Sequence, residues 1–181
     1  MIFGLFRNRK HNQAIMLRQY ELLTAASRNP VLFLDYDVPD TVMGRFEMVS
    51  IVMILFFRRT RKSETSGQEL AQAIVDAFFQ DLDHSIRELG IGDVAVPKRM
   101  KKFAGMFYGR LESYAKALDE GDGDALAVAL RRNIYPSKDD APDMRPLASY
   151  MIAAEAVLSA EPEALLTTGT MPFPAPERRE G

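Results

Sequence analysis

Apolar residues recur at three- and four-residue intervals along most of the chain, which is the spacing of one face of an α-helix. The longest such run occupies Leu70, Ile74, Phe78, Leu82, Ile86 and Leu89. The pattern predicts helices over residues 12–27, 40–62, 66–89, 97–118, 125–133 and 144–160. We therefore expect an all-α fold, built as a single globular domain of about six helices.

The segments outside these helices divide the chain. Asn29-Pro30 ends the first helix, because the residue before a proline disfavours helical backbone angles, and residues 31–37 should form a short extended link. The helical domain is expected over residues 12–175. Residues 1–11 are a basic and apolar N-terminal segment, and the proline-rich C-terminal end predicts an irregular tail that is mobile over residues 176–181.

Capping and turn residues set the expected helix ends. Asp40 is a plausible N-cap for the second helix, and Ser66-Gly67-Gln68-Glu69 has the spacing of a capping box for the third. Two glycines follow the third helix, so Gly90 or Gly92 should adopt a positive φ where the chain changes direction. Pro97 suits the first turn of the fourth helix.

The second predicted helix is apolar on nearly every side. Its run from Phe46 to Phe57 is interrupted by Glu47 and Ser50, and it is far shorter than the roughly 20 residues that span a bilayer. A helix that is hydrophobic all round is expected in the protein core.

Composition is that of an ordinary soluble domain: 181 residues, 47% hydrophobic, 27% charged, with a formal net charge of −2. This balance does not favour sequence-specific nucleic acid as a partner. The charge is uneven, however, because residues 1–62 carry ten Lys/Arg against five Asp/Glu. The basic third can approach an anionic surface, either lipid headgroups or ribosomal RNA, or it can simply be a solvated mixture of charges.

Four cations surround the first turn of the fourth predicted helix: Lys98, Arg99, Lys101 and Lys102. Positive charges are unfavourable at a helix N-terminus, by a few tenths to about 1 kcal/mol each. Either Glu88 and Asp93 in the preceding turn compensate them, or an external anion does. Together with Arg87, these residues can instead shape a surface that binds a partner protein.

Arg45 and Arg110 each follow a glycine on a largely apolar helix. A buried ion pair with a carboxylate such as Glu47 or Asp93 is one interpretation, and contact with a partner protein is the other. The chain also holds ten methionines, which fill core gaps or line a groove for varied apolar segments. The methionines considered for such a groove are Met43, Met48, Met53, Met100 and Met106.

No pattern of catalytic or metal-binding residues emerges. Cysteine is absent, and the two histidines are far apart in sequence. The turn at residues 119–124 lacks the Glu that ends a calcium loop, since Leu130 falls at the twelfth position. Asp81, Asp83 and His84 are expected to be a solvated helix face. We predict no enzyme activity, no cofactor and no metal.

A set of motifs in fixed order resembles the ubiquinol–cytochrome c chaperone family over roughly residues 12–175. The matching pieces are Asp40–Met48, Phe79–Asp83, Arg87–Asp93, Lys98-Arg99, Phe107–Arg110 and Arg132–Tyr135. The resemblance implies an assembly factor for cytochrome b of the respiratory bc complex. One departure is Val52, where family members often have a histidine.

Under this resemblance the protein is expected to be a chaperone that holds newly made cytochrome b near the ribosome or the inner membrane. The candidate client- or partner-binding residues are Arg45, Met48, Arg87, Glu88, Asp93, Lys98, Arg99, Lys101, Lys102, Arg110 and Tyr114. The sequence begins with a segment unlike a secretory signal and without the targeting extension of mitochondrial members, so a bacterial cytoplasmic protein is expected. A membrane-surface or lipid-binding helical domain is the alternative, and a small helical metalloenzyme is the weakest one.

Overall fold

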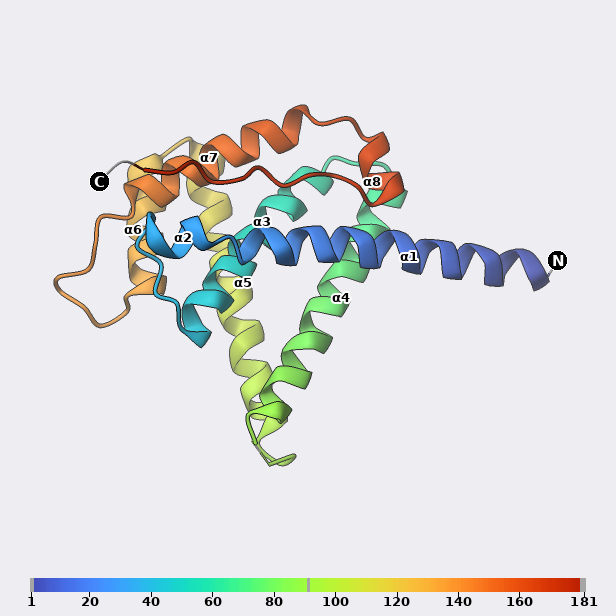
Figure 1. Cartoon of the computed structure of the whole chain (residues 1–181), viewed down its shortest axis with the longest axis horizontal. Helices are drawn as coiled ribbons and strands as arrows, with labels where there is room; N and C mark the ends of the chain where they lie inside the picture. The colour runs from blue at the N-terminus through green and yellow to red at the C-terminus, as the bar shows by residue number, and fades with distance from the viewer. Residues whose placement is uncertain (1, 91, 180–181) are drawn as a thin grey trace.

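The computed structural model describes residues 2–90 and 92–179, without the side chains of residues 2–9 and 65. Its regular structure is entirely helical, which confirms the prediction of an all-α single domain (Figure 1). Six helices have twelve or more residues and two have five. They are α1 (Ile2–Ser27), α2 (Pro30–Leu34), α3 (Val42–Thr60), α4 (Thr65–Glu88), α5 (Val96–Glu120), α6 (Gly123–Ile134), α7 (Arg145–Ala160) and α8 (Ala164–Thr168).

Helix α3 lies at the centre of the fold, as its apolar sequence predicts. Every residue from Ile51 to Phe56 is fully buried, because α3 packs against α1, α4, α5, α6 and α7. The predicted N-cap is wrong by one residue. The Thr41 hydroxyl accepts a hydrogen bond from the Gly44 amide at 3.1 Å, while the Asp40 carboxylate turns outward to pair with Arg45.

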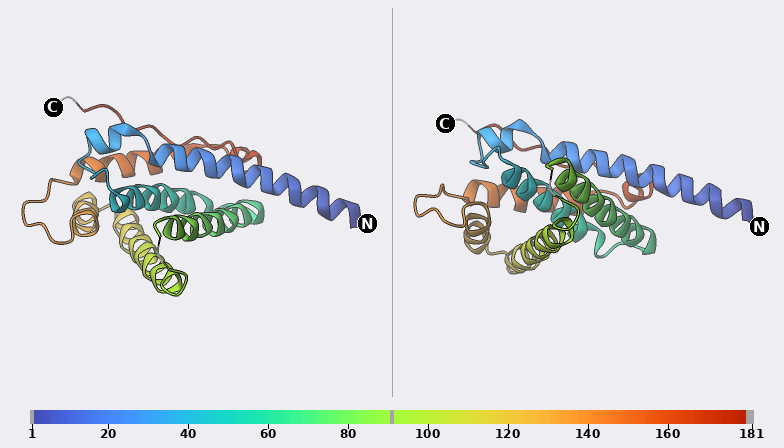
Figure 2. Two further views of the ribbon diagram at one scale, coloured as in Figure 1. Left: turned by 60° about the horizontal axis from the view of Figure 1, so that its bottom comes forward. Right: turned by 90° about the horizontal axis from the view of Figure 1, so that it is seen from below.

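The first two helices differ from the prediction. Helix α1 begins at Ile2 instead of residue 12, and its N-terminal part projects beyond the body (Figures 1 and 2). The extended link expected over residues 31–37 is wrong in its first half, where Pro30–Leu34 forms α2. The Asn29 side chain accepts a hydrogen bond from the Val31 amide at 3.0 Å, and the proline occupies the first turn, so a cap and a preset φ start the helix.

Helices α4 and α5 form an arm that projects from the body and reverses at its far end (Figure 1). Gly90 has a φ of 74°, and Pro97 lies in the first turn of α5, which confirms both predictions. The capping box predicted from Ser66 is wrong. Because α4 already begins at Thr65, Ser66 lies inside the first turn, and the N-cap Glu64 forms no side-chain capping bond.

The chain after α7 turns back across the molecule. Helix α8 ends at Gly169, and residues 170–179, which we call the C-terminal strap, run between α1 and α7 (Figure 1). The tail was expected to be mobile from residue 176, but residues 177 and 179 form hydrogen bonds with the body. The Tyr36 hydroxyl donates to the Glu177 carbonyl at 3.1 Å, and the Arg179 amide donates to the Asp35 carboxylate at 3.2 Å.

Candidate functional site

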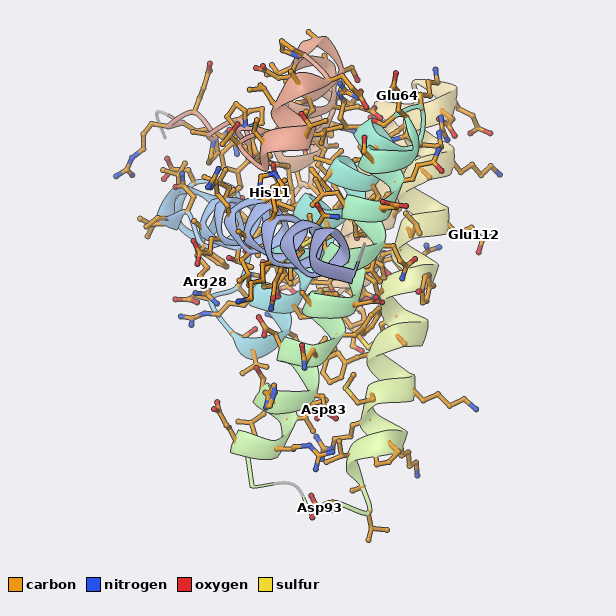
Figure 3. The ribbon with its side chains drawn as sticks, turned by 90° about the vertical axis from the view of Figure 1, so that its right-hand side faces the viewer. His11, Arg28, Glu64, Asp83, Asp93 and Glu112 are labelled. Carbon is orange, nitrogen blue, oxygen red and sulfur yellow. The ribbon has the colours of Figure 1, made fainter. Side chains whose placement is uncertain are left out.

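The candidate residues from the sequence lie in three separate places. Met48, Arg110 and Tyr114 lie in the interior between α3 and neighbouring helices, and Arg45 lies on the surface near the start of α3. The other seven candidates lie toward the far end of the arm, whose side chains are drawn in Figure 3: Arg87, Glu88, Asp93, Lys98, Arg99, Lys101 and Lys102. The eleven residues therefore do not share one surface.

Glu47 in α3 and Arg110 in α5 form a buried ion pair, as predicted for Arg110. The side chains are 2% and 7% exposed, respectively. The Arg110 Nε donates to Glu47 Oε2 at 2.6 Å, and Nη2 donates to Glu47 Oε1, so the contact is bidentate. Arg110 also donates to the Met106 carbonyl at 2.9 Å and lies over the Phe46 ring. This pair ties α3 to α5.

Burial governs the electrostatics of this interior group. It raises the pKa of the Glu47 carboxyl, and the Arg110 guanidinium opposes part of the shift. Burial also raises the pKa of Tyr114, whose hydroxyl accepts a hydrogen bond from the Asn133 amide at 3.1 Å. Met48 and Tyr114 were expected at a client surface, but both are fully buried and offer no exposed atoms to a partner.

Arg45 does not pair with Glu47 or Asp93, which corrects the alternative derived from the sequence. Its side chain is 67% exposed and contacts Asp40 at 2.7 Å. The preceding Gly44 is the constrained residue, because a Cβ there would lie 1.8 Å from the Pro39 carbonyl oxygen. The Gly-Arg pattern at this position therefore reflects a close approach of backbone segments and not a buried guanidinium.

The end of the arm is organised by Arg87. Its Nε donates to Asp83 Oδ2 and its Nη1 to Asp93 Oδ1, each at 2.7 Å, which ties α4 to the following turn (Figure 3). The hydrogen bond from Arg87 lowers the pKa of the Asp83 carboxyl. Asp93 was one of the two carboxylates expected to compensate the cations of α5, but it pairs with Arg87.

The four cations at the start of α5 are all exposed. None of Lys98, Arg99, Lys101 or Lys102 forms an ion pair with a carboxylate in the part of the chain that the structure describes. At about 100° per residue, the three lysines span about a third of the helix circumference, opposite the buried stripe. The N-cap Ala95 adds no side-chain acceptor, so the cations are not compensated there.

Two aliphatic side chains extend the same surface. Leu89 is 64% exposed and Val94 is 96% exposed. We define the arm tip as Arg87–Gly90 together with residues 92–102. Sequence analysis placed Leu89 on the apolar stripe and did not single out Val94. Both residues flank the turn after α4, and their place beside this turn was the available sign that they are exposed.

Aromatic packing fills the space between the arm and α3. The rings involved are Phe46, Phe78, Phe79, Phe103, Phe107 and Tyr108, with centroids 4.9 to 6.4 Å apart. Met48 and Met53 are fully buried, so these two methionines fill the core instead of lining an open groove. The cluster fixes the base of the arm and thereby positions its tip.

Possible metal and membrane features were also considered. No group of three His, Cys, Asp or Glu side chains suited to a metal occurs among the residues that the structure describes. In the acidic turn, Asp122 caps α6 by accepting from the Ala125 amide at 2.8 Å, and Asp119 pairs with Arg58. None of the helices, over the same residues, combines the length and apolarity needed to cross a bilayer.

Comparison with known proteins identifies relatives. The chain is 26% identical over 119 residues to ubiquinol-cytochrome-c reductase complex assembly factor 1 of Xenopus laevis, covering 60% of this chain and 58% of that protein. It is 26% identical over 158 residues to the Mus musculus protein of that name, covering 84% of this chain and 52% of the relative. The chain thus matches a little over half the length of each relative.

A solved structure matches nearly the whole molecule. The crystal structure of the Cbp3 homolog from Brucella abortus has a TM-score of 0.86 and 45% sequence identity, covering 96% of both chains. Residues 34–173 match the family model described as ubiquinol-cytochrome C chaperone. Because this match spans most of the chain, the protein belongs to the ubiquinol–cytochrome c chaperone family.

Proposed function

We propose that the protein is a non-enzymatic assembly chaperone that binds newly synthesised cytochrome b during biogenesis of the respiratory cytochrome bc complex. The observation that carries this proposal is the shared fold with the Cbp3 homolog over 96% of both chains. The named relatives are assembly factors of the ubiquinol–cytochrome c reductase complex. Cytochrome b is the client that the motif resemblance implies.

The arm tip is the proposed contact surface. Its four cations have no described internal partner, so the fold does not account for their presence. An anionic partner does, and the surfaces near nascent cytochrome b are anionic: the ribosome and the inner-membrane lipid headgroups. Contacts made by exposed cations are screened over about 8 Å at physiological ionic strength, so this association should weaken with salt.

The test is recovery of cytochrome b with the tagged, full-length protein from cells that are translating it, measured by mass spectrometry. The variant reverses four charges: Lys98→Glu, Arg99→Glu, Lys101→Glu and Lys102→Glu. We expect a several-fold loss of recovered cytochrome b at a melting temperature no lower than that of wild type, because glutamates are favourable at a helix N-terminus. The matched control makes the same change in net charge elsewhere, with Lys116→Glu, Arg131→Glu, Arg132→Glu and Lys138→Glu, and should retain binding.

Three results would contradict parts of this proposal. Recovery at the wild-type level by the arm-tip variant would show that the cluster is not a contact surface. A lower melting temperature of that variant would show that the cations stabilise the fold. If the wild-type protein itself recovers no cytochrome b, the client assignment fails, whatever the arm tip does.

A second candidate function is that of a peripheral membrane-surface domain without a cytochrome b client. It is favoured by Leu89 and Val94, which are exposed in the arm tip that also holds the four cations. The sequence of residues 2–10, apolar and then basic, has the same character. Sedimentation with phosphatidylglycerol or phosphatidylcholine vesicles, with and without residues 1–11, separates the candidates. Binding to the anionic vesicles and not to the neutral ones, lost in the arm-tip variant and accompanied by no recovery of cytochrome b, would support this second function.

A further inference from the structure

The C-terminal strap is held through its main chain. Three side chains of the body donate hydrogen bonds to its carbonyls: Gln19 of α1, Tyr150 of α7 and Tyr36, which follows α2. They donate to the carbonyls of Met171, Pro174 and Glu177 at 2.9, 2.8 and 3.1 Å, respectively. Gln19 also accepts from the Met171 amide at 3.0 Å. The bonded carbonyls are spaced by three residues.

A three-residue spacing is the repeat of the polyproline II helix, in which every third carbonyl points to the same side. The strap has the matching composition, since residues 172–176 read Pro-Phe-Pro-Ala-Pro. Because the bonds from Gln19, Tyr150 and Tyr36 go to main-chain atoms, they recognise backbone conformation and place little demand on the side chains of the bound segment. Such contacts tolerate a different sequence of the same conformation.

The strap lies in an aromatic-lined groove that it does not fill. The rings of Tyr36 and Tyr150 have centroids 5.7 Å apart. A hollow of about 420 Å³ lies beside these rings and Val157, and another of about 250 Å³ lies beside Leu22 and Ala26. Figure 1 shows the strap running between α1 and α7. Aromatic grooves with spaced hydrogen-bond donors are the usual binding sites for polyproline II segments.

The two halves of the strap are held differently. The first half is fixed, because Met171 is 1% exposed and Gly169, at φ 65°, lies so close to α1 that a Cβ would be 2.3 Å from the Ile15 carbonyl oxygen. The second half has exposed residues at 175 and 177–179, with Pro176 buried between them. Beyond the two tyrosines it is held by the Asp35 carboxylate, which accepts from Arg178 and Arg179.

We propose that residues 174–179 are an exchangeable plug in a groove that binds an extended, proline-containing segment of a partner protein. The plug itself defines the chemistry of the partner segment: carbonyls at three-residue spacing, followed by a basic residue that reaches Asp35. Because the plug is tethered, its effective concentration at the groove is on the order of millimolar. A partner segment that binds weakly is therefore excluded, and one that binds tightly displaces the plug. This inference does not depend on cytochrome b being the client.

The test measures binding of a fluorescent peptide with the sequence of residues 174–179, PAPERR, to the full-length protein by anisotropy. Pro174→Gly with Pro176→Gly weakens the plug, because glycine increases the entropy of the released strap and the buried Pro176 side chain is removed, and it leaves the groove residues intact. We expect the peptide to bind this plug variant at least tenfold more tightly than wild type. Adding Tyr36→Phe and Tyr150→Phe to the plug variant should remove most of the gain. A peptide with glycine in place of each proline is the control and should bind more weakly.

Several results would overturn the proposal. A plug variant that melts like wild type but binds the peptide no better shows that the strap does not exchange. If the two Tyr→Phe changes do not weaken binding, the peptide binds outside this groove. Dimerisation of the plug variant without peptide, seen by light scattering, assigns the groove to the strap of a second copy. If the glycine variant does not fold, Arg178→Ala with Arg179→Ala changes exposed residues only and should still tighten peptide binding several-fold.

Discussion

Arg45 and Arg110 both follow a glycine on a helix, yet their environments are opposite. The Arg45 side chain is 67% exposed beside Asp40, whereas that of Arg110 is 7% exposed and bidentate with Glu47. The difference comes from what faces each residue: solvent at the start of α3, and the central helix at the middle of α5. An exposed pair is screened by water, while a buried one must offset the loss of hydration of both charges.

We predict that Arg110→Met destabilises the protein by about 3–5 kcal/mol at pH 7, because it leaves the Glu47 carboxylate buried without a cation. The pKa of Glu47 is already raised by burial, so its ionisation costs stability as the pH rises through the folded pKa. Without Arg110 this pKa rises further. The difference in free energy of unfolding between wild type and Arg110→Met should therefore become smaller as the pH is lowered from 7 to 5, because the unpaired Glu47 carboxyl takes up a proton.

The measurement is urea unfolding followed by circular dichroism at both pH values. The control is the double variant Glu47→Met/Arg110→Met, which removes both charges and should be closer to wild type than Arg110→Met. An Arg110→Met protein as stable as wild type at pH 7 would mean that the pair is not the tie between α3 and α5.

At the scale of elements, the arm depends on a turn that reverses the chain between α4 and α5. Gly90 caps the end of α4 in a left-handed conformation, while Arg87 holds Asp93 across the turn. The exposed cations begin at Lys98, in the first turn of α5. The left-handed Gly90 and the Arg87–Asp93 ion pair thus define how the chain leaves α4, while the aromatic cluster at the base positions the arm.

Gly90 and Gly92 provide a matched pair of substitutions in this turn. A Cβ at either position meets no atom within 4 Å, but only Gly90 has a positive φ. We predict that Gly90→Ala destabilises by about 1–2 kcal/mol through left-handed strain alone. Gly92→Ala should be neutral or slightly stabilising. Thermal unfolding of the two variants checks this, and equal melting temperatures would remove the role assigned to the Gly90 conformation.

The sequence predicted the interiors of the long helices and failed mainly at their ends. Four-residue apolar spacing located α3, α4, α5 and α7, because burial of one face determines those helices. Helix starts depend on single side chains that compete for the same amides. Thr41 capped α3 where Asp40 was expected, and Asn29 started a short helix in an apolar run that looked extended.

The candidate site was predicted unevenly for a related reason. Residue type and spacing suggested the Glu47–Arg110 pair, since a guanidinium on an apolar helix needs a carboxylate. The spacing of apolar residues could not show that Met48 and Tyr114 are buried. Several helices cover α3, so its buried residues do not form a single stripe. The exposure of Val94 depends on the arm projecting from the body, and this tertiary arrangement cannot be predicted from local spacing.

At the scale of the whole molecule, Arg58 of α3 joins elements that are distant in sequence. Its side chain, 9% exposed, donates to Asp119 of α5 at 2.8 Å and to Glu155 of α7. The next residue, Arg59, reaches Glu163 before α8 at 3.2 Å. The cations at the end of the central helix thus fasten the arm and the C-terminal helices to the same point.

We predict that Arg58→Met destabilises the protein by about 1.5–3 kcal/mol at pH 7, because two carboxylates lose a charged hydrogen-bond donor. Arg61→Met is the control, since Arg61 is 54% exposed and lies 3.5 Å from Asp119, and it should change little. The hydrogen bond from Arg58 lowers the pKa of Asp119. That contribution to stability is present above the unfolded pKa of about 4 and is lost as the pH falls through the folded value. The gap between wild type and Arg58→Met, measured by urea unfolding from pH 7 to pH 3, should therefore narrow on acidification, and a constant gap would show that Arg58 acts through packing alone.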